Sequence, residues 1–195
     1  MVAGALLPVA LHQGKLFFLF GKENPLEDSA KGWSDFGGGS EKGEDPFTTA
    51  LREGSEELTG FLGNKTQLRK TIKRAGGFYK ITHNDYNIHV FFMNYDPDLP
   101  EYFNKNHMFL WKNMNKYMLN KSRMFEKIEI DWFSEEDLKT RRSEYRSFYQ
   151  EISDKIRDHM PHIREFIEKK AKKRSNKKCV CGGNGKRKTL KVRGG

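Results

Sequence analysis

Short runs of aromatic and β-branched residues alternate along the chain with segments of helical periodicity, and this alternation limits the fold more than any other feature. Four runs predict strands, over residues 4–11, 15–21, 86–96 and 125–133. One helix is predicted over 45–58, with Asp45 as N-cap and Pro46 at its first position, and another over 145–160. The order of these elements predicts an α/β sandwich in which helices cover a mixed sheet.

The organisation of the chain follows from its length and its charge. The 195 residues can bury one core, so we expect one domain over 1–168, with an insertion at about 100–124 and C-terminal helices over 134–168. Residues 169–195 hold 12 of the 36 Lys and Arg and no Asp or Glu, which leaves 24 basic against 26 acidic residues before them. Such a segment is typical of a disordered tail, which either binds a polyanion or serves solubility or targeting.

The compartment is predicted from the N-terminus and the cysteines. The apolar opening 1–20 has no basic start and is broken at Pro8, so it fits neither a signal peptide nor a membrane span. Cys179 and Cys181 are the only cysteines, and their C-x-C spacing excludes a disulfide framework and falls short of a four-ligand zinc site. We therefore expect a reducing, cytoplasmic compartment and no membrane partner.

The predicted helix at 45–58 is unusually acidic on one side. A glycine-rich loop at 37–39 leads into it, and Glu53, Glu56 and Glu57 stand at i, i+3 and i+4, so their carboxylates share one face. Like charges at this spacing repel. A hard divalent cation, Mg²⁺ or Mn²⁺, would relieve the repulsion, and the alternative is an ordinary solvated acidic face.

The spacing around these carboxylates resembles that of a known family. Gly38, five residues, Glu44, seven residues, Arg52-Glu53, two residues and Glu56-Glu57 match the charged positions of the Nudix box, G-x5-E-x7-R-E-U-x-E-E-x-G-U. The stretch "IDWFSEEDL" at 130–138 is similar to the last strand and following helix of the family, and the resemblance covers about residues 3–168. The chain departs from the box where Gly54 replaces an aliphatic residue and Thr59 replaces a glycine.

The resemblance to Nudix hydrolases implies a fold, an activity and a set of site residues. The fold would be an α/β/α sandwich with a mixed sheet and a loop–helix–loop catalytic motif. The reaction would be hydrolysis of a nucleoside diphosphate linked to another moiety, with Mg²⁺ or Mn²⁺ as cofactor. The implied metal ligands are the carboxylates of Glu53, Glu56 and Glu57 and the backbone oxygen of Gly38, and the implied supporting residues are Arg52 and Glu44.

The general base in this family is either a box glutamate or a carboxylate from a later loop. Glu126 and Glu129 are the downstream candidates, and they point to different sides of a strand because alternate residues face opposite ways. We expect Glu126 to be the base, against the alternative of a surface glutamate.

Candidates for substrate binding are aromatic and basic residues near the predicted strand ends. An aromatic side chain could stack on a nucleobase and a lysine could meet a phosphate, although each is also an ordinary core or surface residue. The candidates are Lys22, Trp33 and Phe36, with Phe78 and Tyr79 as further platforms. The insertion mixes Phe103, Phe109, Trp111 and Tyr117 with lysines, which suits either a nucleic-acid or cap-binding surface or an amphipathic packing helix.

Three functions remain open. The first is hydrolysis of the mRNA cap, as in the Nudix decapping enzymes, including those of large DNA viruses, with the basic tail binding RNA in a host cytoplasm. The second is hydrolysis of dinucleoside polyphosphates, nucleotide sugars or diphosphoinositol polyphosphates. The third is a non-catalytic RNA-binding protein, which the intact Glu53, Glu56 and Glu57 disfavour.

Overall fold

A computed structural model describes residues 2–24, 31–115, 117–118 and 125–181. The strands are β1 (Ala3–His12), β2 (Lys15–Glu23), β3 (Trp33–Ser34), β4 (Phe36–Gly39), β5 (Phe78–His83), β6 (Tyr86–Phe92) and β7 (Lys127–Ser134). The helices are α1 (Pro46–Glu57), α2 (Lys65–Arg74), α3 (Asp98–Asn113), α5 (Asp137–Thr140), the 3₁₀ turn η1 (Arg142–Glu144), α6 (Tyr149–Asp158) and α7 (Met160–Cys181). The four predicted strands and the helix at 45–58 are confirmed, whereas α2 and β3–β5 were not predicted.

The described strands form one mixed sheet in the order β3-β2-β1-β6-β5, with β4 paired to β1 and β7 to β2. Strands β1 and β6 are parallel, and the other pairs are antiparallel. The segment at 37–39 is therefore part of strand β4, and the expectation of a loop there was wrong. Its glycines pair with Ala3, Gly4 and Ala5 of β1, because residues without side chains let the two backbones approach closely.

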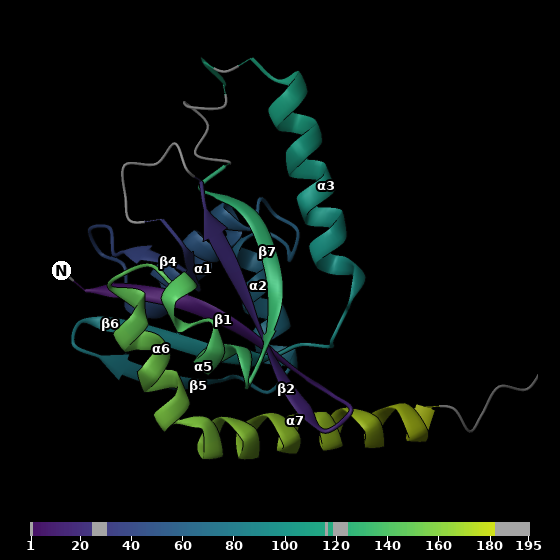
Figure 1. Ribbon diagram of the computed structural model, residues 1–195. Helices are drawn as coiled ribbons and strands as arrows, with labels where there is room; N and C mark the ends of the chain where they lie inside the picture. The colour runs from purple at the N-terminus through teal and green to yellow at the C-terminus, as the bar shows by residue number, and fades with distance from the viewer. Residues whose placement is uncertain (1, 25–30, 116, 119–124, 182–195) are drawn as a thin grey trace, which may run out of the picture.

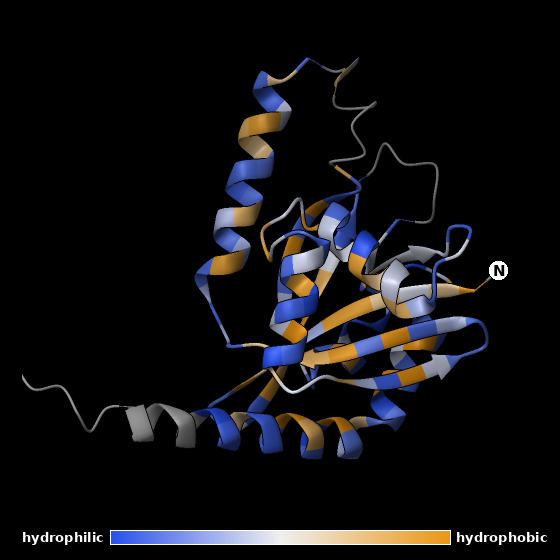
Figure 2. Cartoon of the chain, turned by 180° about the vertical axis from the view of Figure 1, so that it is seen from behind, coloured by the Kyte–Doolittle hydropathy of each residue, from blue (hydrophilic) through white to orange (hydrophobic). Residues whose placement is uncertain are grey.

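Helices cover both faces of the sheet, which confirms the α/β sandwich with a mixed sheet. Alternate residues of β1 point to opposite faces, so Leu6 packs with α1 and α2, whereas Leu7 joins the cluster that contains α6 and α7. In Figure 1, α1 and α2 lie behind the strands and α6 lies in front of them. Figure 2 shows the central strands as largely apolar.

Helix α1 is held against β1 by contacts that require glycine. A Cβ atom on Gly4 would lie 1.9 Å from the carbonyl oxygen of Pro46, and one on Gly54 would lie 2.6 Å from Cδ1 of Leu6. Leu6, a buried residue of the sheet, thus occupies the space that a side chain at position 54 would fill. The helix begins as predicted, since Asp45 Oδ1 accepts a hydrogen bond of 2.8 Å from the Thr48 amide.

The domain boundary predicted at residue 168 falls inside helix α7, which continues to Cys181. Ile163 and Ile167 are buried in the core and Ala171 packs against it, a four-residue spacing that extends the apolar stripe into the basic segment. The end of α7 projects beyond the body of the molecule (Figure 1). The side chains of Cys179 and Cys181, and all of 182–195, lie outside the described residues.

The predicted insertion at 100–124 contains α3, which stands out from the body (Figure 1) and is joined to it mainly through β7. The side-chain amide of Asn104 pairs with the backbone of Ile130, with distances of 2.9 and 3.3 Å. Residues 116 and 119–124 of the insertion lie outside the described residues. No helix in the described part of the chain is long and apolar enough to cross a membrane.

Candidate functional site

The site is built where β4 meets α1, and Arg52 is at its centre. The guanidinium donates to both oxygens of Glu44 at 3.2 to 3.3 Å, to Glu53 Oε1 at 2.8 Å, to Glu56 Oε2 at 3.3 Å and to the Gly39 carbonyl at 3.0 Å. Hydrogen bonds from Arg52 lower the pKa of Glu44 to about 2. Arg52 therefore ties the strand, the loop and the helix together, as a supporting residue would.

Glu53 lies directly over the glycine strand. A Cβ atom on Gly38 would be 2.5 Å from Oε1 of Glu53, so only glycine leaves room for this carboxylate. Burial raises the pKa of Glu53, and the adjacent Arg52 only partly offsets this. Glu56, one turn further along α1, is the more exposed member of the set.

Glu57 is buried beneath these groups and faces Lys127, the first residue of strand β7. Its Oε1 lies 3.3 Å from Nζ of Lys127, and its Oε2 has no hydrogen-bond partner among the described residues. Burial raises the pKa of Glu57 well above its ordinary value, Lys127 opposes this, and the carboxylates of Glu23, Glu53 and Glu126 reinforce it. Lys127 therefore does not fully compensate the negative charge of Glu57 and the carboxylates around it.

Lys127 belongs to a buried ion-pair network that the sequence did not reveal. Its Nζ lies 2.5 Å from Glu23 Oε1 and 2.7 Å from Ser34 Oγ, and Arg146 also pairs with Glu23. Burial alone would lower the pKa of Lys127, but Glu57 and Glu23 together raise it. Gly21 makes room for the stem, since a Cβ atom there would lie 2.9 Å from Lys127 Cδ.

The two downstream glutamates lie in different environments. Glu126 is half-buried at the start of β7, and its charge is near enough to Glu57 to raise the pKa of that residue. Glu129 instead pairs with Lys22, with 3.2 Å between Oε2 and Nζ. Of the two, Glu126 is the one whose charge acts on Glu57, and its role as the general base stays a prediction.

The burial of Trp33 and Phe36 contradicts their predicted role as platforms for a nucleobase. Trp33 is 3% exposed and Phe36 is fully buried, because both pack into the core on opposite faces of the sheet. Phe78 packs on Phe47, with ring centroids 4.6 Å apart, and the Tyr79 hydroxyl lies 2.8 Å from His159 Nδ1. Trp33 and Phe36 therefore have no free face for stacking, whereas Phe78 and Tyr79 are half-buried and packed on neighbouring rings.

Lys22 reaches solvent, unlike Trp33 and Phe36, but it is committed to other contacts. Besides Glu129, its Nζ lies 5.6 Å from the ring centroid of the buried Trp33. A partly exposed pair of this kind is weak. Lys22 can therefore exchange Glu129 for a phosphate at small cost, and its role stays a prediction.

The carboxylates fit a hard divalent cation by their chemistry. As they stand, no three His, Cys, Asp or Glu side chains in the described ranges are grouped so as to hold a metal ion. The fit rests on the orphaned Oε2 of Glu57, on the pKa-raising burial of Glu53 and Glu57, and on the all-oxygen donor set, which suits Mg²⁺ or Mn²⁺. Glu56, at the surface, has the freedom to turn toward them.

Comparison with known proteins gives a distant likeness in fold. Neither a protein-family model nor a curated protein sequence matches the chain. A C. elegans Ap4A hydrolase is 15% identical in a binary complex (TM-score 0.46, 82% of this chain and 97% of that one) and 17% identical alone (0.45, 84% and 99%). A NUDIX hydrolase from Nitrosomonas europaea is 16% identical, with a TM-score of 0.40 over 83% of this chain and 88% of that one. At these values the likeness assigns neither family nor substrate, so the function is argued from the residues.

Proposed function

We propose that this protein is a Nudix-type, metal-dependent pyrophosphohydrolase of nucleoside-diphosphate-linked substrates. One observation carries the proposal. Arg52 binds three motif glutamates from the loop and the helix, and Glu53 lies against Gly38. The sixth motif residue, Glu57, is buried on the same helix and faces Lys127. A solvated acidic face would need neither the buried Glu57 nor an arginine bonded to both strand and helix.

Each residue of the constellation has a role in the proposed reaction. Glu53, Glu56 and Glu57, with the backbone oxygen of Gly38, would hold Mg²⁺ or Mn²⁺, which when bound polarises the pyrophosphate and lowers the pKa of the attacking water. Arg52 and Glu44 keep the carboxylates in register with the strand. Glu126 accepts the proton of the attacking water.

Hydrolysis of the mRNA cap is the reaction that we place first. The observation in its favour is the charge of the C-terminal segment 169–195, which contains 12 basic residues and no acidic one, and whose first part lies on the projecting end of α7. A polyanionic RNA would be attracted there by release of counterions. The viral origin and the host cytoplasm belong to the same proposal.

Small phosphorylated molecules are the alternative substrates. Dinucleoside polyphosphates, nucleotide sugars and diphosphoinositol polyphosphates also present a diphosphate to the carboxylates, but they have no extended backbone for a basic segment to bind. A non-catalytic RNA-binding protein would keep the fold without needing Glu57 in its buried position.

The test is turnover of capped RNA, a dinucleoside polyphosphate and an inositol pyrophosphate by the wild type and by Glu56→Gln and Glu57→Gln. We expect Mg²⁺-dependent release of a diphosphate product by the wild type and only background release by both variants, because an amide keeps the shape but not the charge. Glu165→Gln is the matched control, since Glu165 is an exposed glutamate of helix α7, outside the motif. Near-native turnover by Glu56→Gln, whose fold should be unaffected, would refute the assignment.

A further inference from the structure

A cavity of about 340 Å³ opens between α3 and the start of β7. Its walls are formed mainly by apolar side chains, with Trp111 and Met108 on α3 facing Phe125 and Ile128 across the opening. The volume is within the range of about 300–1,000 Å³ found for small-molecule sites. Asn24 and Lys112 supply polar groups at its edge.

The wall of the cavity is a packed row of rings. His107 stacks on Phe103 with centroids 3.9 Å apart, and Phe125 meets His107 at 5.3 Å and Trp111 at 6.2 Å. Phe103 and His107 are buried, so the row is anchored, whereas Trp111 at its end remains 38% exposed. An anchored aromatic with one open side is suited to stacking a planar ligand.

The cavity adjoins the acidic site through a short stretch of β7. Phe125 lines the cavity, Glu126 acts electrostatically on Glu57, and Lys127 pairs with Glu57 at 3.3 Å. Phe125 and Lys127 are only two residues apart in the chain, so a ligand seated in the cavity can extend from there toward the carboxylates.

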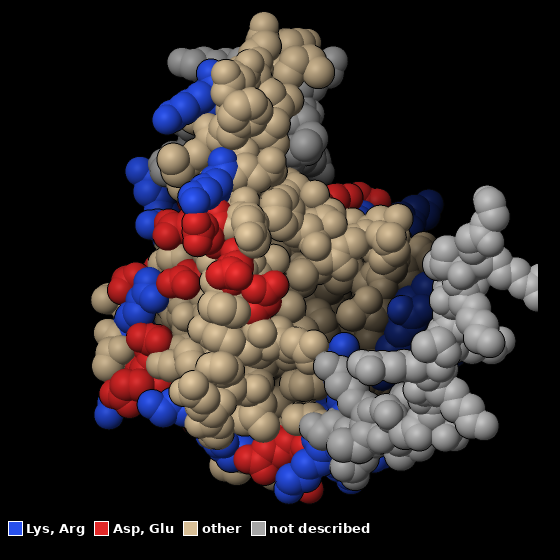
Figure 3. All heavy atoms as spheres, turned by 90° about the vertical axis from the view of Figure 1, so that its right-hand side faces the viewer, with Lys and Arg blue, Asp and Glu red and all other residues tan. Residues whose placement is uncertain are grey.

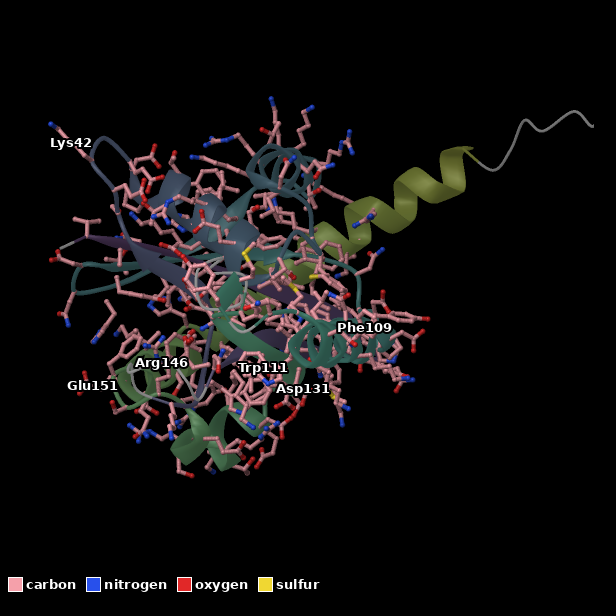
Figure 4. All side chains as sticks on the ribbon, turned by 90° about the horizontal axis from the view of Figure 1, so that it is seen from above. Lys42, Phe109, Trp111, Asp131, Arg146 and Glu151 are labelled. Atoms are coloured by element: carbon pink, nitrogen blue, oxygen red, sulfur yellow. The ribbon has the colours of Figure 1, made fainter. Side chains whose placement is uncertain are left out.

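Only some of the exposed side chains of α3 line the cavity, and they lie on one side of the helix. Trp111 and Phe109, two residues apart, leave the helix on opposite sides, and Figure 4 shows Trp111 on the side of Arg146 and Phe109 on the outer side. Figure 3 shows the protruding top of the molecule as largely uncharged, with a few basic groups along its edge. Phe109 is 65% exposed and is not among the residues that line the cavity.

We infer that this cavity binds the nucleobase of the substrate, stacked on Trp111, while the diphosphate lies at the acidic site. The inference rests on the proposed function for the position of the diphosphate. It replaces Trp33 and Phe36, which are buried, as the base-recognising aromatics.

The test measures binding without turnover, using guanosine 5′-(α,β-methylene)diphosphate and, as its counterpart without a base, methylenediphosphonate. By calorimetry in Mg²⁺, the wild type should bind the nucleotide more tightly than methylenediphosphonate. Trp111→Ala should weaken nucleotide binding at least about fivefold and leave methylenediphosphonate binding unchanged. Trp111→Phe should restore most of the affinity, and Phe109→Ala should have no effect.

Two results would overturn the inference. Equal affinity of the wild type for both probes would mean that the cavity takes no base and is open to another apolar partner, such as a protein side chain. If Trp111→Ala and Phe109→Ala lost the same affinity for the nucleotide, the base would not be stacked on Trp111 in the cavity. Because neither probe is cleaved at its methylene bridge, the two binding results do not depend on turnover. Failure of the hydrolase assignment is seen in the turnover assay, and failure of the base site is seen in the difference between the two probes.

Discussion

Lys127→Met removes the cation that faces Glu57 and keeps the apolar stem that fills the space beside Gly21. In the structure, Nζ of Lys127 contacts Glu23, Glu57 and Ser34. Arg146 remains paired with Glu23 in the variant, so one carboxylate, that of Glu57, is left buried without a cation. Breaking a buried pair in this way costs about 3–5 kcal/mol, which is a large part of a typical stability of about 5–15 kcal/mol.

The loss of stability should depend on pH in a definite direction. The folded-state pKa of Glu57 is already raised above the ordinary 4.5 by burial, and loss of Lys127 raises it further. A carboxyl group with a raised folded pKa contributes its full stability below its unfolded pKa and loses it as the pH rises from there toward the folded value. The cost of Lys127→Met should therefore be greatest at neutral pH and should shrink as the pH is lowered toward 4.5.

Urea unfolding followed by circular dichroism at pH 7 and pH 5 would measure this. The control is Lys105→Met, which breaks an exposed pair with Glu101 and should have little effect on stability at either pH value. The reasoning is refuted if Lys127→Met costs no more than the control at pH 7, or if its cost is the same at both pH values.

Two further predictions concern the arginine and the C-terminal segment. Arg52→Lys removes the guanidinium, whose hydrogen bonds hold the pKa of Glu44 at about 2. A carboxyl group with a lowered folded pKa contributes stability above pH 4.5, and this contribution is lost as the pH falls toward 2. The melting temperatures of variant and wild type should thus converge between pH 6 and pH 3, and a constant difference would contradict this role. Truncation after Cys181 spares helix α7 and removes five basic residues, so the log–log salt dependence of capped-RNA binding should flatten by up to about 3.5. Identical slopes for truncated and full-length chains would favour a small-molecule substrate.

Local patterns were enough to predict the helix of the motif and most of the core strands. The cap at Asp45, the Pro46 start and the spacing of Arg52 from Glu44 are all encoded within a few turns of chain, and the structure contains each of these features. Lys127 could not be found in this way, because its partner Glu23 is 104 residues away and a lysine in an amphipathic strand normally reads as exposed.

The exposure of the aromatic residues and the helix in the basic segment could not be predicted, for different reasons. Exposure of Trp33 and Phe36 depends on which helix covers each face of the sheet, and a run of aromatics carries no such information. In α7 the density of lysine hid the four-residue spacing of Ile163, Ile167 and Ala171, which was present in the sequence.

The close seating of α1 on β1 restricts how the acidic site can respond to a ligand. Pro46 packs directly on Gly4, and Gly54 packs directly on Leu6, so the helix contacts the strand closely near both of its ends. Such tight packing resists sliding of the helix along the sheet. The helix and the sheet beneath it therefore move as one piece. Adjustment to a cation or a diphosphate falls to the side chains, above all to the exposed Glu56, so binding would reorient carboxylates on a backbone that stays still.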